Sequence, residues 1–155
     1  MCLMLYIGTA EELPPVCSAD LSIESVDPSR ENVKRLFSQP AVRFVGAHTG
    51  CSCGFPSIMA ESPLEYYEGM PFESDDRAAD LRSVRALIEL VGQAMARSER
   101  VELYPVADGD ESETPKGVIE WQLRSLVPER LFFNERFMHV IQNRKHPSSG
   151  SPPVE

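Results

Sequence analysis

Apolar and polar positions along the chain follow short alternating stretches that predict strands. Residues 2–7 are almost continuously apolar, which is typical of a strand buried on both faces. Leu21, Ile23 and Val26 predict a second strand, and residues 41–48 predict a third. Later strands are expected at 101–106, 118–123, 131–133 and 136–141, the last two forming a closing hairpin around Asn134-Glu135. Within the first of these, Pro105 is expected near a sheet edge or a strand end.

The longest periodic pattern predicts a helix from about residue 75 to residue 98. Its apolar positions recur at three and four residues, and they are Leu81, Val84, Ile88, Val91 and Met95, widened by Leu87 and Ala94. Ser74 is the expected cap. A helix of this extent would be roughly 36 Å long, enough to lie across a sheet. Asp27-Pro28 predicts the start of a second, shorter helix whose apolar stripe is Val33, Leu36 and Phe37.

Strands in succession near the end of the chain, together with two helices, indicate the α+β class. We expect one domain over residues 1–142, with a largely antiparallel or mixed sheet of six to seven strands. The long and the short helix should pack together on one face of it. Residues 143–155 are rich in Pro, Ser and Gly and predict a flexible C-terminal tail. Residues 56–73 predict a long surface connection, and the sequence does not decide whether it covers a site as a lid.

The chain is acidic, with 24 Asp and Glu against 15 Lys and Arg and a formal net charge of −9. Such a field repels phosphate backbones, so we expect no nucleic-acid partner. Residues 2–7, the longest apolar run, fall far short of the roughly 20 residues that a membrane span needs. The N-terminus also lacks the pattern of a signal peptide. A cytoplasmic protein with reduced thiols is therefore expected.

One short loop carries the candidate chemistry. His48, Cys51 and Cys53 bring an imidazole and two thiols close together in sequence. Residues i and i+2 of an extended segment point the same way, so the two thiols can share one partner. Zinc or another thiophilic metal prefers such ligands, but a structural zinc site needs a fourth. Cys2 could supply it if the first and third strands are antiparallel neighbours, because it would then lie at the same end of the sheet.

Three alternatives to a metal site remain open at this level. The loop cysteines could be redox-active or nucleophilic thiols. They could instead act as small hydrophobes in a non-catalytic interaction or scaffold domain. In the third alternative, Cys2 becomes the first residue and serves as the nucleophile of an N-terminal-nucleophile hydrolase. Those enzymes have a larger four-layer sandwich, and Cys2 begins an apolar strand, so core packing explains this residue better.

Two further features favour structural interpretations. His139 lies within a predicted strand and is expected to be a satisfied structural histidine. The acidic segment 108–113 offers Asp108, Asp110 and Glu111 to a hard cation, but it lacks the full calcium-loop pattern and is expected to be a solvated hairpin turn.

Two stretches of the chain resemble a bacterial family. Residues 1–7 read Met-Cys-Leu-Met-Leu-Tyr-Ile, and residues 45–55 read Val-Gly-Ala-His-Thr-Gly-Cys-Ser-Cys-Gly-Phe. They resemble a group of small bacterial proteins that open with a Met-Cys strand and carry a Gly-x-His-x-Gly-Cys-x-Cys-Gly-Phe stretch. The group has no assigned activity, so the resemblance implies a bacterial origin and a link between Cys2 and the loop.

The leading hypothesis from the sequence is a small protein with a thiol or metal-binding site made by Cys51, Cys53, His48 and Cys2. Its partner would be a small ligand or another protein. No motif in the sequence assigns a substrate or a reaction. The competing hypothesis is the scaffold domain, and burial of the thiols distinguishes the two, because buried thiols react slowly.

Overall fold

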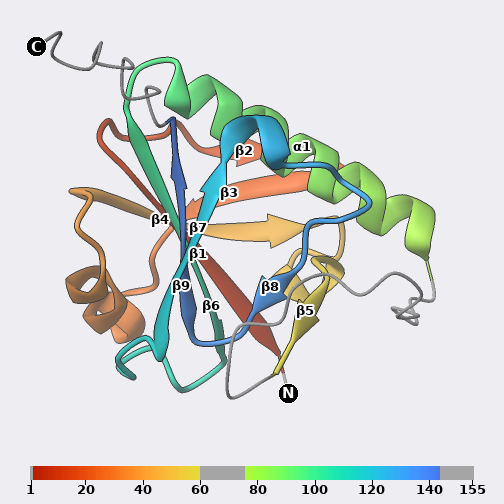
Figure 1. Cartoon of the computed structure of the whole chain (residues 1–155). Coiled ribbons are helices and arrows are strands. Elements are labelled where there is room, and N and C mark those ends of the chain that lie inside the picture. Colours follow the sequence, from red (N-terminus) through yellow and green to blue (C-terminus); the bar gives the residue numbers. More distant parts are fainter. Residues whose placement is uncertain (1, 60–75, 144–155) are drawn as a thin grey trace, which may run out of the picture.

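A computed structural model describes residues 2–59 and 76–143 of the chain. They are organised around one seven-stranded sheet with the order β2-β3-β4-β1-β6-β9-β7 (Figure 1). Every neighbouring pair is antiparallel except β7 and β9, which are parallel. The strands are β1 Leu3–Thr9, β2 Val16–Cys17, β3 Leu21–Ser25, β4 Ala41–Ala47, β6 Arg100–Ala107, β7 Gly117–Gln122 and β9 Phe137–Gln142. The predicted α+β class and mixed sheet are confirmed.

Helix α1, Arg77–Met95, covers one face of the sheet (Figure 1). Its cap is Asp76, whose carboxylate accepts a hydrogen bond from the amide of Ala79 at 3.0 Å. The predicted cap and start, Ser74 and Asp75, lie outside the described residues. The buried stripe of α1 includes Val84, Leu87, Val91 and Met95, and it packs in one cluster with strand residues such as Leu5, Ile7, Val45 and Leu103. The predicted stripe members Leu81 and Ile88 are only half-buried.

The short helix lies on the opposite face, so the prediction that both helices share one face is wrong. It is the 3-10 helix η1, Pro28–Leu36, and Asp27 caps it as predicted by accepting from the amide of Ser29 at 2.8 Å. Val33 and Leu36 pack in a second cluster with Tyr6. The physical reason is β1 itself: its side chains are apolar on both faces, and each face needs its own cover.

The predicted closing hairpin is also wrong. Strand β8, Phe133–Asn134, pairs in parallel with β5, Ser57–Ile58, in a separate two-stranded sheet. Strand β9 already has β6 on one side and β7 on the other, so it has no free edge for β8. Pro105 lies near the end of β6, which is one of its two predicted places, although β6 is an interior strand of the sheet. The β6–β9 ladder stops at Leu103, so the missing N–H of Pro105 interrupts no bond to β9.

The acidic segment after β6 is not a solvated hairpin turn, because β9 lies between β6 and β7. Glu111 is buried and accepts hydrogen bonds from Arg30 at 2.9 Å, from the Tyr6 hydroxyl at 3.3 Å and from the amide of Gly109 at 2.9 Å. Burial, with the nearby Glu111 carboxylate, raises the pKa of Tyr6 to about 12. Arg30 also pairs with Asp108 at 2.8 Å, so this segment ties η1 to the end of β6.

His139 is the structural histidine that the sequence predicts. It is fully buried, its Nδ1 lies 2.9 Å from Trp121 Nε1, and its Nε2 lies 3.1 Å from the amide nitrogen of Asn134. A neutral imidazole has one acceptor nitrogen, so the ring accepts one of these bonds in either tautomer. Burial lowers the pKa of His139 to about 4, which keeps the ring neutral at physiological pH.

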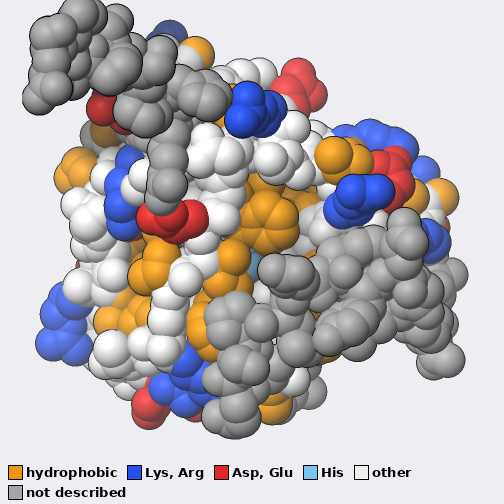
Figure 2. Space-filling model, viewed as in Figure 1, with side chains coloured by type: hydrophobic (Ala, Val, Ile, Leu, Met, Phe, Trp, Pro, Cys, Tyr) orange, Lys and Arg blue, Asp and Glu red, His pale blue; other side chains and the backbone are white. Residues whose placement is uncertain are grey.

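On the face that Figure 2 shows, the described residues form no large patch of one charge sign. Basic and acidic side chains are interspersed there around an apolar centre (Figure 2). Among the described residues, no helix is long and apolar enough to cross a membrane.

Candidate thiol site

The loop after β4 is folded tightly back on the strand that it leaves. The amide of Ala47 donates to the carbonyl of Cys51 at 2.8 Å, and the amide of Gly50 donates to the carbonyl of Ala47 at 2.9 Å. Gly50 has a φ of 81°, a conformation that glycine adopts without strain. The chain then forms the short 3-10 helix η2, Ser52–Gly54. These bonds place Cys51 and Cys53 at the end of the sheet, beside the start of β1.

Ser52 fixes the segment that carries both thiols. Its side chain is fully buried, accepts from the amide of Leu5 at 2.8 Å and donates to the carbonyl of Val45 at 2.7 Å. The hydroxyl therefore bridges β1 and β4 at the pair Leu5↔Val45, which ends their ladder on the side where β1 starts. Because the middle residue of the Cys-Ser-Cys segment is inserted between two strands, the cysteines on either side of it are left outside the core.

The exposure of the cysteines contradicts the packing interpretation. Cys2, Cys17 and Cys53 are exposed and Cys51 is half-exposed, so none of them serves as a small core hydrophobe. This also corrects the expectation that Cys2 is explained by core packing. The chain places Cys2 just before β1, where its carbonyl accepts from the amide of Asp108 at 2.9 Å.

Cys51 is the more acidic of the two loop thiols. Its partial burial acts to raise the pKa, but hydrogen bonds from the Thr49 hydroxyl and from the amide and thiol of Cys53 outweigh burial and lower the pKa of Cys51. The Thr49 Oγ1 atom lies 3.3 Å from Cys51 Sγ. These donors favour the thiolate at Cys51, and a thiolate is the reactive form of cysteine.

Cys53 is shifted in the other direction. Burial and the hydrogen bond with Cys51 raise the pKa of Cys53 to about 11, against a smaller opposing contribution from the amide of Leu3. The charge of Cys2 also acts on Cys53, which places a third thiol near the pair. This neighbourhood follows from the antiparallel pairing of β1 with β4, the arrangement that brings Cys2 to the same end of the sheet as the loop.

His48 does not join the thiols in one ligand set. Its Nε2 atom lies 2.7 Å from Asp80 Oδ1 on the first turn of α1, and its amide donates to Ser83 Oγ at 3.0 Å. Within residues 2–59 and 76–143, no group of three or more His, Cys, Asp or Glu is arranged to hold a metal ion. The four predicted ligands therefore divide in this conformation into a cysteine group and a His48–Asp80 pair.

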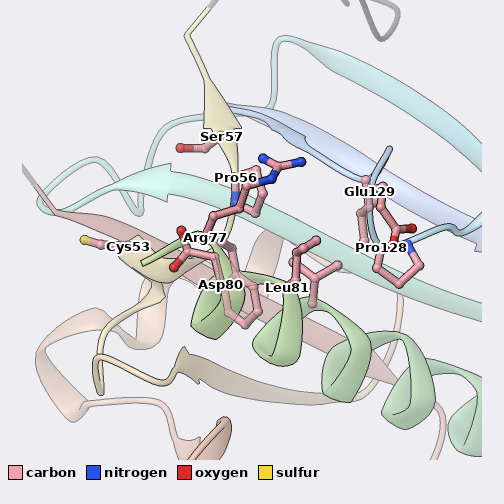
Figure 3. A pocket seen from close by; sticks show the side chains of 11 residues that line it. Cys53, Pro56, Ser57, Arg77, Asp80, Leu81, Pro128 and Glu129 are labelled. Carbon is pink, nitrogen blue, oxygen red and sulfur yellow. The ribbon is translucent and has the colours of Figure 1, made fainter. Parts of the chain in front are cut away.

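A cavity of about 190 Å³ opens beside Cys53, between the start of α1, β5 and the segment before β8 (Figure 3). Cys53 lies at one end of it, with Pro128 and Glu129 at the other, while Arg77, Asp80 and Leu81 project from α1 (Figure 3). The rest of the wall is mainly apolar and includes Phe55, Val84 and Leu131.

Sequence reasoning missed three residues of this region. Ser52 stands between two cysteines, but nothing in its local sequence shows that its hydroxyl bridges two strands. Asp80 and Arg77 fall in the first turn of the predicted long helix, and the helical spacing alone does not say which loop they face. The one usable signal is that Arg77 and Asp80 stand close to the predicted start of the helix, where a side chain can reach a neighbouring loop.

The described residues thus define an α+β domain with one exposed and one half-exposed thiol, Cys53 and Cys51, at one end of its sheet. No protein-family model, no curated protein and no solved structure matches this chain. The resemblance of residues 1–7 and 45–55 to a bacterial family therefore stays a prediction.

Proposed function

We propose that Cys51 and Cys53 form a redox-active dithiol that exchanges with disulfides, with Cys51 as the nucleophile and Cys53 as the resolving thiol. The observation that carries this proposal is the exposure of two cysteines, two residues apart, on a segment pinned by buried Ser52: Cys53 is exposed and Cys51 half-exposed. Their opposite pKa shifts support the division of roles, because the attacking thiol must be a thiolate and the resolving thiol acts later.

The reaction has two exchange steps. The Cys51 thiolate attacks one sulfur of a substrate disulfide, the substrate S–S bond breaks, and its electron pair leaves on the departing thiolate. Cys53 then attacks the Cys51 sulfur of the mixed disulfide, which forms the Cys51–Cys53 disulfide and releases the second substrate thiol. The protons of the two cysteines end on the two released thiols, so the substrate gains two electrons and the dithiol loses two.

A reducing compartment suits this activity. We propose that the protein works in the cytoplasm, where cellular thiols keep such a pair reduced and return it to the dithiol after each exchange. The scaffold alternative is less well supported, because it needs buried cysteines and these are exposed or half-exposed. The N-terminal-nucleophile alternative gains no support from the architecture of the described residues, a main seven-stranded sheet with a helix on each face.

Intact-mass analysis after a brief reaction with 2-hydroxyethyl disulfide tests the proposal. The wild-type chain should lose two hydrogens and carry no adduct. The Cys53→Ser variant should accumulate a mixed disulfide at Cys51, because no resolving thiol removes it. The Cys51→Ser variant should react roughly tenfold more slowly, since burial raises the pKa of the remaining Cys53 thiol and leaves less of it as the thiolate. Cys17→Ser, which removes an exposed cysteine of β2, is the matched control and should behave as wild type.

Two outcomes would reject the proposal. Equal adduct formation at all four cysteines would show that the loop has no special reactivity. A stoichiometric metal adduct in the native mass, lost on denaturation together with the protection of Cys2, Cys51 and Cys53, would instead identify the loop as a binding site for zinc or another thiophilic metal.

A further inference from the structure

Another cavity lies on the face of the sheet that η1 covers. It opens between the start of η1, the orange coil of Figure 1, and strands β1, β3 and β4. Its volume of about 480 Å³ falls within the range of roughly 300–1,000 Å³ that is usual for small-molecule sites. None of the described residues that line it is a cysteine, so the cavity is separate from the proposed dithiol.

The floor of this cavity is apolar and aromatic. Met4 and Phe44 line it and are only half-buried, although both pack against the buried cluster beneath η1. The strand registers pair Phe44 with Tyr6 of β1 and with Glu24 of β3. Since paired residues point to the same face of a sheet about 5 Å apart, Phe44 lies between the other two. Part of an aromatic ring is therefore left open, with a carboxylate beside it.

The charges around the cavity do not cancel. Glu24 and Asp27 line it, and Arg30 is the one cation among the described residues that do. Arg30 is itself held by two further carboxylates, Asp108 at 2.8 Å and Glu111 at 2.9 Å. Four carboxylates against one guanidinium leave these side chains with a net charge of −3.

The nearest further cation does not offset this charge. Arg43 donates to Ser25 Oγ at the cavity wall at 2.8 Å, but it also pairs with Glu12 at 2.6 Å. Glu24, in contrast, is exposed and has no ion pair or hydrogen bond from its side chain to any residue that the structure describes. Its carboxylate is free for a ligand that lies on Phe44. The face of an aromatic ring also attracts cations, because it is the negative end of the ring quadrupole.

We infer that this cavity binds a small organic cation, an ammonium group on a short apolar body, with the ammonium between Glu24 and the ring of Phe44. Glu24 supplies the opposite charge, and Phe44 supplies a cation–π contact. The apolar body lies against Met4 and covers the apolar surface that the floor of the cavity leaves exposed. This site goes beyond the proposed dithiol function and does not depend on it.

Benzylammonium and benzyl alcohol test the inference, because they have nearly the same shape and differ in charge. The dissociation constant of each is measured from the amide signals of β1, β3 and β4 in the full isotope-labelled chain. Benzylammonium should bind in the millimolar range, at least about fivefold more tightly than benzyl alcohol. Glu24→Gln and Phe44→Leu should each weaken benzylammonium roughly two- to fivefold. Because Glu24 is exposed, its substitution leaves the core unchanged.

Glu89→Gln is the matched control. Glu89 is exposed on α1, which covers the other face of the sheet, and its substitution removes the same charge. This variant should bind benzylammonium as the wild-type chain does.

Three results would overturn the inference. Benzylammonium could cause no saturable shift in the three strands, or benzyl alcohol could bind as tightly. If Glu89→Gln weakened binding as much as Glu24→Gln, the net charge of −9 alone would be attracting the cation. The dithiol proposal is independent of all three, because it is tested through Cys51 and Cys53.

Discussion

Replacing Ser52 with alanine tests how the structure presents its thiols. The hydroxyl is fully buried and bridges the Leu5 amide at 2.8 Å and the Val45 carbonyl at 2.7 Å. Alanine removes both contacts and leaves a donor and an acceptor without partners in the interior. Each buried polar group left unsatisfied costs about 1–3 kcal/mol. With partial relief from an entering water molecule, Ser52→Ala should lower the free energy of unfolding by roughly 2–4 kcal/mol.

Urea denaturation measures the total effect, and hydrogen exchange of the Leu5 amide locates it. Protection of this one amide should fall more than that of its neighbours in β1, because its acceptor is the atom that is removed. Ser57→Ala is the matched control: Ser57 has an exposed side chain in β5, and its loss should change stability by less than about 0.5 kcal/mol.

Ser52→Ala should also slow the reaction of Cys51 with 2-hydroxyethyl disulfide, because the Cys-Ser-Cys segment loses its anchor. A variant that unfolds with wild-type free energy and keeps the wild-type exchange rate at Leu5 would refute the reasoning. The bridge would then be dispensable, and the loop would be held by its backbone turn alone.

Two further substitutions test buried groups. The pKa of His139 is about 4 in the native chain, against 6.5 for a histidine that is not buried. As the pH falls, the unfolded chain therefore takes up a proton before the native chain does. The free energy of unfolding should fall by roughly 3 kcal/mol between pH 6.5 and pH 4. Urea denaturation across this range should show a smaller loss in His139→Gln; equal losses would mean that this ring is not the titrating group. Gly54→Ala should destabilise by roughly 1–3 kcal/mol, because a Cβ there would lie 2.8 Å from that of Ala47. Gly92→Ala, with open space around its Cβ, should instead stabilise α1 by roughly 0.5–1 kcal/mol, and equal effects at both glycines would contradict the packing argument.

Local patterns predicted the elements that local physics controls. The apolar period of α1 and the Asp27-Pro28 start of η1 are sequence signals that need no distant partner, and the structure contains both. The burial of β1 is also predictable from the sequence, because both of its faces are apolar. What this pattern does not fix is which helix covers which face, and η1 took the face opposite α1.

Partners that are far apart in sequence were not predictable. Strand β8 has only two residues, too few for a period, and it pairs with β5 about 75 residues earlier. The candidate site divides in the same way. Cys51 and Cys53 were found from their spacing, but His48 faces Asp80 on another element, and that pairing exists only in the folded chain.

The central position of β1 sets the order in which the protein can assemble. Its partner β4 follows within about 40 residues, whereas β6 lies about 100 residues later, and both ladders are needed to complete the middle of the sheet. During synthesis β3, β4 and β1 can pair before α1 and β6 leave the ribosome. The apolar side of this partial sheet, with Leu5, Ile7 and Val45, stays in contact with water until α1 is synthesised and covers it. Nascent chains should therefore aggregate most readily before α1 has formed.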